Sequence, residues 1–250
     1  MLKFDNVTFK YDSDDYEMIK GLSFNVQDGE FISLIGASGC GKSTAFRLIN
    51  GLEKPQSGSI TINGTPIKEL KNYSSYMPQK DLLYPWRTIE KNVCLPMELR
   101  KESKEKMKKA AEEILEEVGL LEYRNKYPRD LSGGMRQRAS FARALLAGAN
   151  LLLLDEPFSA LDSLTRIGLQ EWLLTEWEKR KNTILFVTHD VEEAIFLSQK
   201  VFVITDRPIT HFEEYVVPLD YPRKRDDLKR SDIMELKEEL IKKLRQEEVK

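Results

Sequence analysis

The sequence is short of the features that mark membrane, secreted and nucleic-acid-binding proteins. No apolar run approaches the roughly 20 residues needed to span a bilayer, and residues 1–5 lack the apolar core of a secretory signal. Two cysteines, Cys40 and Cys94, are too few for a disulfide scaffold. Lys and Arg number 39 against 41 Asp and Glu, so the net charge of -2 gives no support for nucleic-acid binding. These absences predict a cytoplasmic protein.

What is present is a pattern of short strands followed by helices. A chain of 250 residues can form one large α/β domain, or a domain with an inserted subdomain. Residues 2–26 mix short apolar runs with turn residues, which predicts an antiparallel ribbon. An apolar run over 30–35 is followed at once by a helical pattern over 43–50, and such a strand–loop–helix unit belongs to a parallel sheet. Further strands are predicted at 60–62, 73–77, 151–154 and 183–187.

The middle of the chain is helical and rich in charge. Within 88–120, the residues Ile114, Leu115 and Val118 mark an apolar helix face, and a second helix is predicted over 134–146. We therefore expect residues 83–150 to form a helical insertion in an α/β core. Residues 226–250 form a tail with apolar residues at helical spacing, which predicts a docked amphipathic helix; these residues are Ile233, Leu236, Leu240 and Leu244.

The strongest motif is a glycine-rich loop between the predicted strand at 30–35 and the following helix. Residues 36–44 read GASGCGKST and fit G-x-x-x-x-G-K-[ST] in the correct context. Glycines let the backbone wrap around phosphate oxygens, so that N–H groups and the helix N-terminus point at the anion. Lys42 would add a positive charge near the β- and γ-phosphates, and the Ser43 hydroxyl would ligate Mg²⁺. The predicted nucleotide-binding residues are Gly36, Ser38, Gly39, Cys40, Gly41, Lys42, Ser43 and Thr44.

Two acidic residues follow the apolar run at 151–154. Four leucines suit a strand buried on both faces, which places Asp155 at the carboxyl edge of the sheet. There Asp155 can hold Mg²⁺ through its water shell, and Glu156 can activate the attacking water as a general base. Adjacent acids after a strand are also common as solvated loop residues, but the phosphate-binding loop upstream favours the catalytic interpretation.

A second anion-binding pattern occurs at residues 131–134, which read LSGG. Ser132, Gly133 and Gly134 open a predicted helix, where free N–H groups and the helix dipole favour negative charge. One nucleotide cannot use two unrelated phosphate sites in one small chain. The simplest resolution is a two-fold dimer, in which each site clamps ATP that is bound mainly by the partner.

These motifs, in this order and spacing, resemble the ATP-binding cassette (ABC) family from the N-terminus to about Asp206, and LSGG is the signature sequence of that family. The resemblance implies a single ABC ATPase domain over 1–250, with a P-loop NTPase core, a mixed sheet, an antiparallel β-subdomain and an inserted α-helical subdomain. It implies ATP and Mg²⁺ as cofactors, and ATP hydrolysis coupled to transmembrane transport. By resemblance, Tyr11 would stack on adenine, Gln79 would reach Mg²⁺ and the attacking water, His189 would contact the γ-phosphate, and Asp162 would lie in the dimer-contacting loop.

The stretch Leu82-Leu83-Tyr84-Pro85-Trp86 points to a branch of the family. It is similar to importer cassettes of the nitrate, sulfonate and taurine group, which includes cassettes for pyrimidine precursors. The resemblance implies a homodimer on the inner face of the cell membrane, with permease subunits and an external substrate-binding protein as partners and no nucleic acid. Next to Gln79, these residues would suit a socket for a permease helix. Alternatively, they close the core of the helical insertion.

Three other functions compete with an importer motor. An ordinary phosphate-loop kinase would not need the sequence at 132–134. A soluble ABC ATPase acting on ribosomes or DNA normally carries paired cassettes or long coiled coils. The ATPase subunit of an exporter remains a third alternative, because exporter and importer cassettes carry the same motifs.

Overall fold

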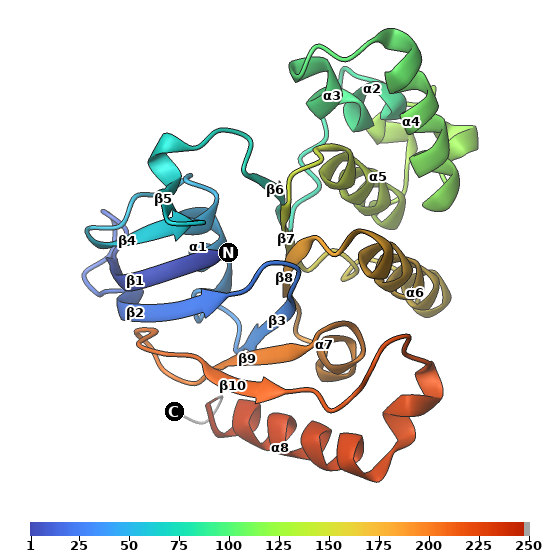
Figure 1. Ribbon diagram of the computed structural model, residues 1–250. Helices are drawn as coiled ribbons and strands as arrows, with labels where there is room; N and C mark the ends of the chain where they lie inside the picture. Colours follow the sequence, from blue (N-terminus) through green and yellow to red (C-terminus); the bar gives the residue numbers. More distant parts are fainter. Residues whose placement is uncertain (248–250) are drawn as a thin grey trace.

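The computed structural model describes residues 1–247, which form two β-sheets surrounded by helices (Figure 1). The smaller sheet is antiparallel and has the strand order β2-β1-β4-β5, with β1 (Leu2–Phe9), β2 (Ile19–Val26), β4 (Ser57–Ile62) and β5 (Thr65–Pro66). In β1, a register shift between Phe4 and Val7 keeps both side chains buried. The antiparallel ribbon predicted over 2–26 is therefore confirmed.

The larger sheet has six strands in the order β10-β9-β3-β8-β7-β6. Only β10 is antiparallel to its neighbour. The strands are β3 (Phe31–Gly36), β6 (Ser74–Met77), β7 (Leu151–Asp155), β8 (Thr183–Val187), β9 (Lys200–Ile204) and β10 (Glu213–Val216). Every residue of β3, β7 and β8 is buried, which explains why their sequences are predominantly apolar. The predicted mixed sheet with an antiparallel subdomain is confirmed, and β9 and β10 are strands that no sequence pattern predicted.

Helices cover both faces of the larger sheet. Helix α1 (Lys42–Ile49) lies between the two sheets, and its Phe46 and Leu48 are buried with apolar residues of β1, β3 and β7. On the other face, α6 (Ser163–Arg180) packs against the sheet beside helix α5 (Gly133–Leu146). Four short 3₁₀ helices join the main elements; they are Ile67–Glu69, Leu121–Tyr123, Pro128–Asp130 and Arg225–Lys229.

The helical stretch predicted over 88–120 is divided into three helices. They are α2 (Ile89–Val93), α3 (Leu95–Leu99) and α4 (Lys104–Glu117). Pro96 starts a new helix, and Lys101 has a φ of 58° in the left-handed region, which ends it. Ser103 then caps α4 by accepting the N–H of Lys106. With α5, these helices occupy the chain between β6 and β7, and their treatment as an inserted subdomain over 83–150 stays a prediction.

The C-terminal part of the chain returns to the sheet. Helix α7 (Val191–Leu197) is followed by β9 and β10, and helix α8 (Ser231–Glu247) packs against α7 along the lower edge of the molecule in Figure 1. Ile233 and Leu240 of α8 are buried, and Leu236 and Leu244 are partly buried against the same cluster. The helix begins at Ser231, later than the tail boundary at 226, and residues 248–250 of that tail lie outside the described residues. None of the helices described over 1–247 has the length and apolarity to span a bilayer.

Candidate active site

The glycine-rich loop has a fixed shape because its glycines meet close neighbours. A Cβ on Gly36 would lie 2.9 Å from Cys40 Sγ, and a Cβ on Gly41 would lie 2.9 Å from Ile209 Cδ1. Gly41 also has a φ of 110°, a conformation that side chains disfavour. The buried Lys42 donates from Nζ to the backbone oxygens of Gly36, at 2.7 Å, and Ala37, at 2.8 Å. The loop therefore holds a positive charge at its own centre.

A cleft of about 460 Å³ opens over this loop, a volume within the usual range for small-ligand sites. The loop enters the cleft from between β3 and α1, whereas Gln79 follows β6, Glu156 follows β7 and His189 follows β8. These strands are parallel, so their carboxyl ends meet at one edge of the sheet. The lining residues are Met18, Gly36, Ser38, Gly39, Gly41, Lys42, Ser43, Thr44, Gln79, Glu156 and His189.

The three predicted catalytic side chains converge in this cleft. Gln79 Nε2 donates to Glu156 Oε2 at 3.1 Å, and His189 Nδ1 lies 3.5 Å from the same oxygen. Glu156 has a φ of 50°, and its N–H donates to the Val187 carbonyl at 2.9 Å. This left-handed conformation turns the chain sharply after β7. One carboxylate is thereby held between an amide and an imidazole, facing the phosphate-binding loop.

Asp155 lies behind Glu156 and is 2 % exposed. Burial raises the pKa of its carboxyl group, and a hydrogen bond with Ser43 acts in the opposite direction. Tyr76 donates its hydroxyl to Asp155 Oδ2 at 3.5 Å. The described residues contain no cluster of three or more His, Cys, Asp or Glu side chains that could hold a metal alone. Mg²⁺ prefers oxygen ligands and usually combines one or two carboxylates with phosphate oxygens and water, so the oxygens of Ser43 and Asp155 fit this ion.

Two predicted nucleotide-binding residues lie beside the cleft without lining it. The Tyr11 hydroxyl is hydrogen-bonded to Thr44 Oγ1 at 3.1 Å, which ties Tyr11 to the start of α1. Cys40 is buried behind the loop, with its Sγ 3.8 Å from Lys42 Nζ. The structure therefore places Tyr11 near the phosphate-binding loop and turns the Cys40 side chain inward.

The cleft over the phosphate-binding loop is not lined by residues 132–134 or by Asp162. Ser132 is exposed and caps α5, with its Oγ accepting the Met135 N–H at 3.3 Å. Asp162 caps α6 by accepting the Thr165 N–H at 3.0 Å, and these local hydrogen bonds lower the pKa of the Asp162 carboxyl group. Within one chain, neither group lines the cleft over the phosphate-binding loop.

Gln137 is a buried polar residue near the site that no sequence motif marks. Its Nε2 donates to the Glu156 carbonyl at 2.9 Å and to Ser159 Oγ at 3.1 Å, and its Oε1 accepts the Ala160 N–H at 2.8 Å. It thereby joins α5 to the loop that follows Glu156. A glutamine on a helix carries no sequence signal for such a contact. Met18, a further lining residue, likewise has no motif around it.

The aromatic stretch after Gln79 divides into a buried residue and exposed ones. Leu83 is 9 % exposed and belongs to the core under the helices, whereas Leu82 is 61 % exposed, Tyr84 40 % and Trp86 71 %. Arg143 donates to the carbonyls of Asp81 and Leu82, which fixes this stretch to α5. Leu83 therefore closes the core, and the other three side chains face outward.

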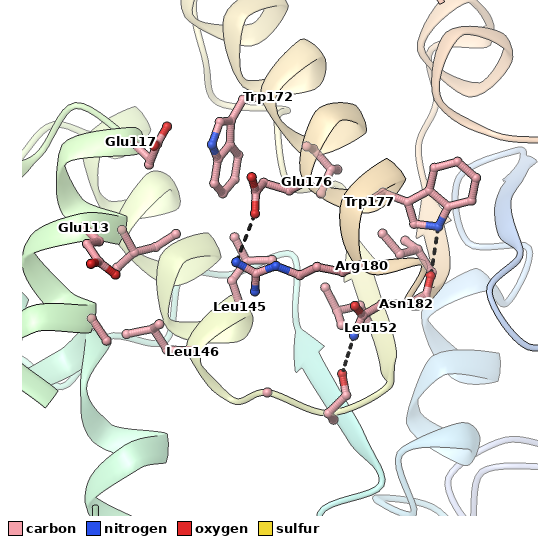
Figure 2. A pocket seen from close by; sticks show the side chains of 16 residues that line it. Glu113, Glu117, Leu145, Leu146, Leu152, Trp172, Glu176, Trp177, Arg180 and Asn182 are labelled. Carbon is pink, nitrogen blue, oxygen red and sulfur yellow. Dashed lines mark hydrogen bonds and ion pairs between the residues drawn. The ribbon is translucent and has the colours of Figure 1, made fainter. Parts of the chain in front are cut away.

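A second cavity, of about 550 Å³, lies between α4, α5 and α6 (Figure 2). The apolar walls of this cavity include Leu145, Leu146 and Trp172. Figure 2 shows Arg180 extending into the cavity beside Glu176. An Arg180 guanidinium nitrogen (Nη2) lies 2.9 Å from Glu176 Oε2. The lining contains no glycine-rich phosphate-binding loop, and its carboxylate Glu176 is paired with the cations Lys179 and Arg180. The smaller cleft over the phosphate-binding loop is therefore the candidate active site.

Comparisons with known proteins agree with this geometry. Residues 19–159 match the family described as ABC transporter. The formylaminopyrimidine import ATP-binding protein ThiZ of Halalkalibacterium halodurans is 46% identical, covering 90% of this chain and 87% of that protein. The nitrate import ATP-binding protein NrtD of Synechococcus elongatus is 40% identical, covering 90% and 84%. The dimeric ATP-binding cassette MJ0796, solved in a post-hydrolysis state bound to ADP and Pi, is 30% identical with a TM-score of 0.80, covering 88% of this chain and 100% of that chain.

Proposed function

We propose that this chain, which belongs to the ABC transporter family, is the ATP-hydrolysing subunit of an importer and uses Glu156 as its general base. The observation that carries the proposal is the position of Glu156, held between Gln79 and His189 at the edge of the phosphate-binding cleft. A carboxylate in this position can take a proton from water as the oxygen attacks the γ-phosphate. The products are ADP and inorganic phosphate.

The other groups of the cleft have separate tasks in this proposal. Lys42 and the backbone N–H groups of the loop stabilise the charge on the phosphate oxygens. Gln79 and His189 orient the attacking water and the γ-phosphate, respectively. Mg²⁺, held by Ser43 and Asp155 and reached by Gln79, would neutralise part of the phosphate charge. Tyr11 would stack on the adenine base.

The functional unit in this proposal is a head-to-tail homodimer around two ATP molecules. Ser132 and Gly133 are exposed at the N-terminus of α5 and do not line the cleft of their own chain, and Asp162 is exposed at the N-terminus of α6. A two-fold partner would bring these groups to the γ-phosphate held by the first chain. The dimeric cassette similar to this chain, solved with ADP and Pi, supports this arrangement.

The proposed partners are permease subunits at the inner face of the cell membrane and an external substrate-binding protein. The exposed side chains of Leu82, Tyr84 and Trp86 would receive a permease helix. Relatives named for the import of formylaminopyrimidine, aliphatic sulfonates and nitrate support a small solute as cargo. We propose nitrate, a sulfonate, taurine or a pyrimidine precursor.

Replacing the proposed base tests the function directly. Glu156→Gln removes the proton acceptor but keeps the side-chain shape, so ATP should still bind while phosphate release falls by about 10²–10⁴-fold. Because product formation breaks the clamp, the variant should accumulate as a dimer when ATP is added. Sedimentation and phosphate release, with and without ATP, measure both effects. The exposed Glu116→Gln on α4 is the matched control, and equal hydrolysis by the two variants would contradict the proposal.

A further inference from the structure

Helices α6 and α7 bury a pair of polar side chains that the proposed chemistry does not use. Gln170 is 3 % exposed and Glu193 is 6 % exposed. Gln170 Nε2 donates to Glu193 Oε1 at 2.5 Å. Burial raises the pKa of Glu193, against the effect of its hydrogen bonds. A buried acid is costly, and two apolar side chains of similar size would often be as stable or more so. The pair is therefore expected to have a task other than stability.

The pair is connected to the turn that carries His189. The Thr188 hydroxyl donates to Glu193 Oε2, and the Asp190 N–H donates to Thr188 Oγ1 at 3.0 Å. Asp190 Oδ1 in turn accepts the Glu193 N–H at 3.2 Å. Both chain neighbours of His189 are thus fixed by Glu193. The His189 side chain itself is 67 % exposed, and its Nδ1 lies 3.5 Å from Glu156 Oε2.

The same pair is connected to the segment that precedes α8. Arg225 donates to Gln170 Oε1 at 2.5 Å, and its guanidinium lies 3.8 Å from the centre of the Phe196 ring on α7. Because Gln170 accepts from Arg225 with its oxygen, its amide group must donate to Glu193. The orientation of Gln170 is therefore fixed from both sides.

We propose that Gln170 and Glu193 are positioning residues for His189. In this proposal Arg225 links the C-terminal segment, which begins at Arg225 and includes α8, through them to the turn at 188–190. The inference rests on the proposed role of His189. Movement of the C-terminal segment would release Gln170, loosen the Thr188–Glu193 contact and shift His189 relative to the γ-phosphate. The tail would then regulate hydrolysis without touching the nucleotide.

Exchanging the amide and the carboxylate between positions 170 and 193 tests whether their hydrogen bond positions His189. Gln170→Glu places two carboxyl groups against each other, and kcat for ATP should fall by roughly 10- to 100-fold, as expected for a misplaced catalytic group. The KM for ATP should change little, since the phosphate-binding loop is untouched. Adding Glu193→Gln to Gln170→Glu restores all three hydrogen bonds of the pair. The carboxylate at position 170 then accepts from Arg225 and from the amide at position 193, and the amide oxygen at position 193 accepts from the Thr188 hydroxyl. Recovery of kcat in the double variant is expected. A double variant as inactive as the single one, with a melting temperature equally reduced, would assign the pair to packing alone and overturn the proposal.

The link to the tail has its own matched pair of variants. Arg225→Met keeps an apolar side chain against Phe196 but removes the hydrogen bond to Gln170, so kcat should fall on the order of two- to tenfold. It also removes an exposed ion pair with Glu171 and a 3.4 Å contact with the Ile167 carbonyl. Arg230→Met, in the same segment, removes only a surface ion pair with Asp232 and should leave kcat unchanged. Equal kcat values for the two variants would overturn the role of Arg225.

The two histidines allow a test that does not depend on activity. His189 and His211 are the only histidines of the chain, so imidazole ¹³C–¹H spectra contain one set of signals for each. Gln170→Glu should shift or broaden the His189 signals, the double variant should restore them, and His211 should serve as an unchanged reference. Unchanged His189 signals in Gln170→Glu would overturn the proposal. A wild-type chain without ATPase activity would instead contradict the proposed function, and the spectra would still decide whether the pair positions His189.

Discussion

The phosphate-binding loop and the turn at 132–134 are both glycine-containing turns at a helix N-terminus, but their surroundings differ. The loop lies in a cleft that includes Gln79, Glu156 and His189 from three other strand ends. The turn at 132–134 is exposed or partly exposed, and its Ser132 side chain only caps its own helix. The fold of one chain therefore completes the first site and leaves the second without a ligand-facing wall. A second copy can supply that wall.

Substitutions in the two turns should separate binding from hydrolysis. Lys42→Ala removes the charge at the centre of the loop, so ATP binding and hydrolysis should both be lost. Ser132→Arg puts bulk on the exposed turn, so the single chain should still bind ATP, while hydrolysis falls by about 10²-fold or more through loss of the transition-state contacts. Fluorescent ATP binding and phosphate release measure the two effects. Loss of ATP binding by dilute, monomeric Ser132→Arg would contradict the contrast between the sites.

Mixing these two inactive variants provides the control. In a mixed dimer, the intact loop of the Ser132→Arg chain faces the intact turn of the Lys42→Ala chain, so one of the two sites is complete. If half of the dimers are mixed, activity should return to roughly a quarter of the wild-type value. No recovery upon mixing would show that each chain hydrolyses ATP with groups of its own.

The contrast between the two turns also shows what the sequence can predict. Buried strands such as 151–154 and the loop at 36–44 were identified because local apolarity and glycine placement determine them. The strand β9 (Lys200–Ile204) was missed, since a short apolar run without a motif has no unique interpretation. The division into α2, α3 and α4 was not predicted, because the charge pattern over 88–120 is continuous. The left-handed backbone conformation of Lys101, which ends α3, has no signal in that pattern. Likewise, which residues of the Leu82–Trp86 stretch face inward depends on α5, far along the chain.

Replacing Gln137 should have an effect of intermediate size on hydrolysis. Its side chain connects α5, which begins at the turn at 132–134, to the loop after Glu156 in the cleft. Gln137→Leu leaves the Ala160 N–H, normally bonded to Gln137, without its partner and frees the loop after Glu156. An unsatisfied buried group should lower the free energy of unfolding by about 1–3 kcal/mol, and hydrolysis should fall as well. Denaturant unfolding and phosphate release measure both. Gln199→Leu is the matched control, because Gln199 Oε1 accepts the Phe31 N–H outside the cleft. It should lower the free energy of unfolding without a comparable loss of hydrolysis.

Trp86→Ala should have the smallest effect on the isolated chain and the clearest effect on its assembly. The side chain is 71 % exposed, so its removal should barely change the melting temperature or the basal ATPase rate. If a permease helix buries the ring, truncation should weaken the complex by about 2 kcal/mol or more, and co-purification with the permease should fall. The neighbouring Leu83→Ala is the contrasting variant, since that buried side chain supports the core and its loss should lower stability by about 2–5 kcal/mol. A Trp86→Ala chain that unfolds at a lower temperature but still co-purifies with the permease would mean that the aromatic ring supports the fold of its own chain. An unchanged melting temperature with lost co-purification would place Trp86 in the same class as the turn at 132–134, as a surface completed by another chain.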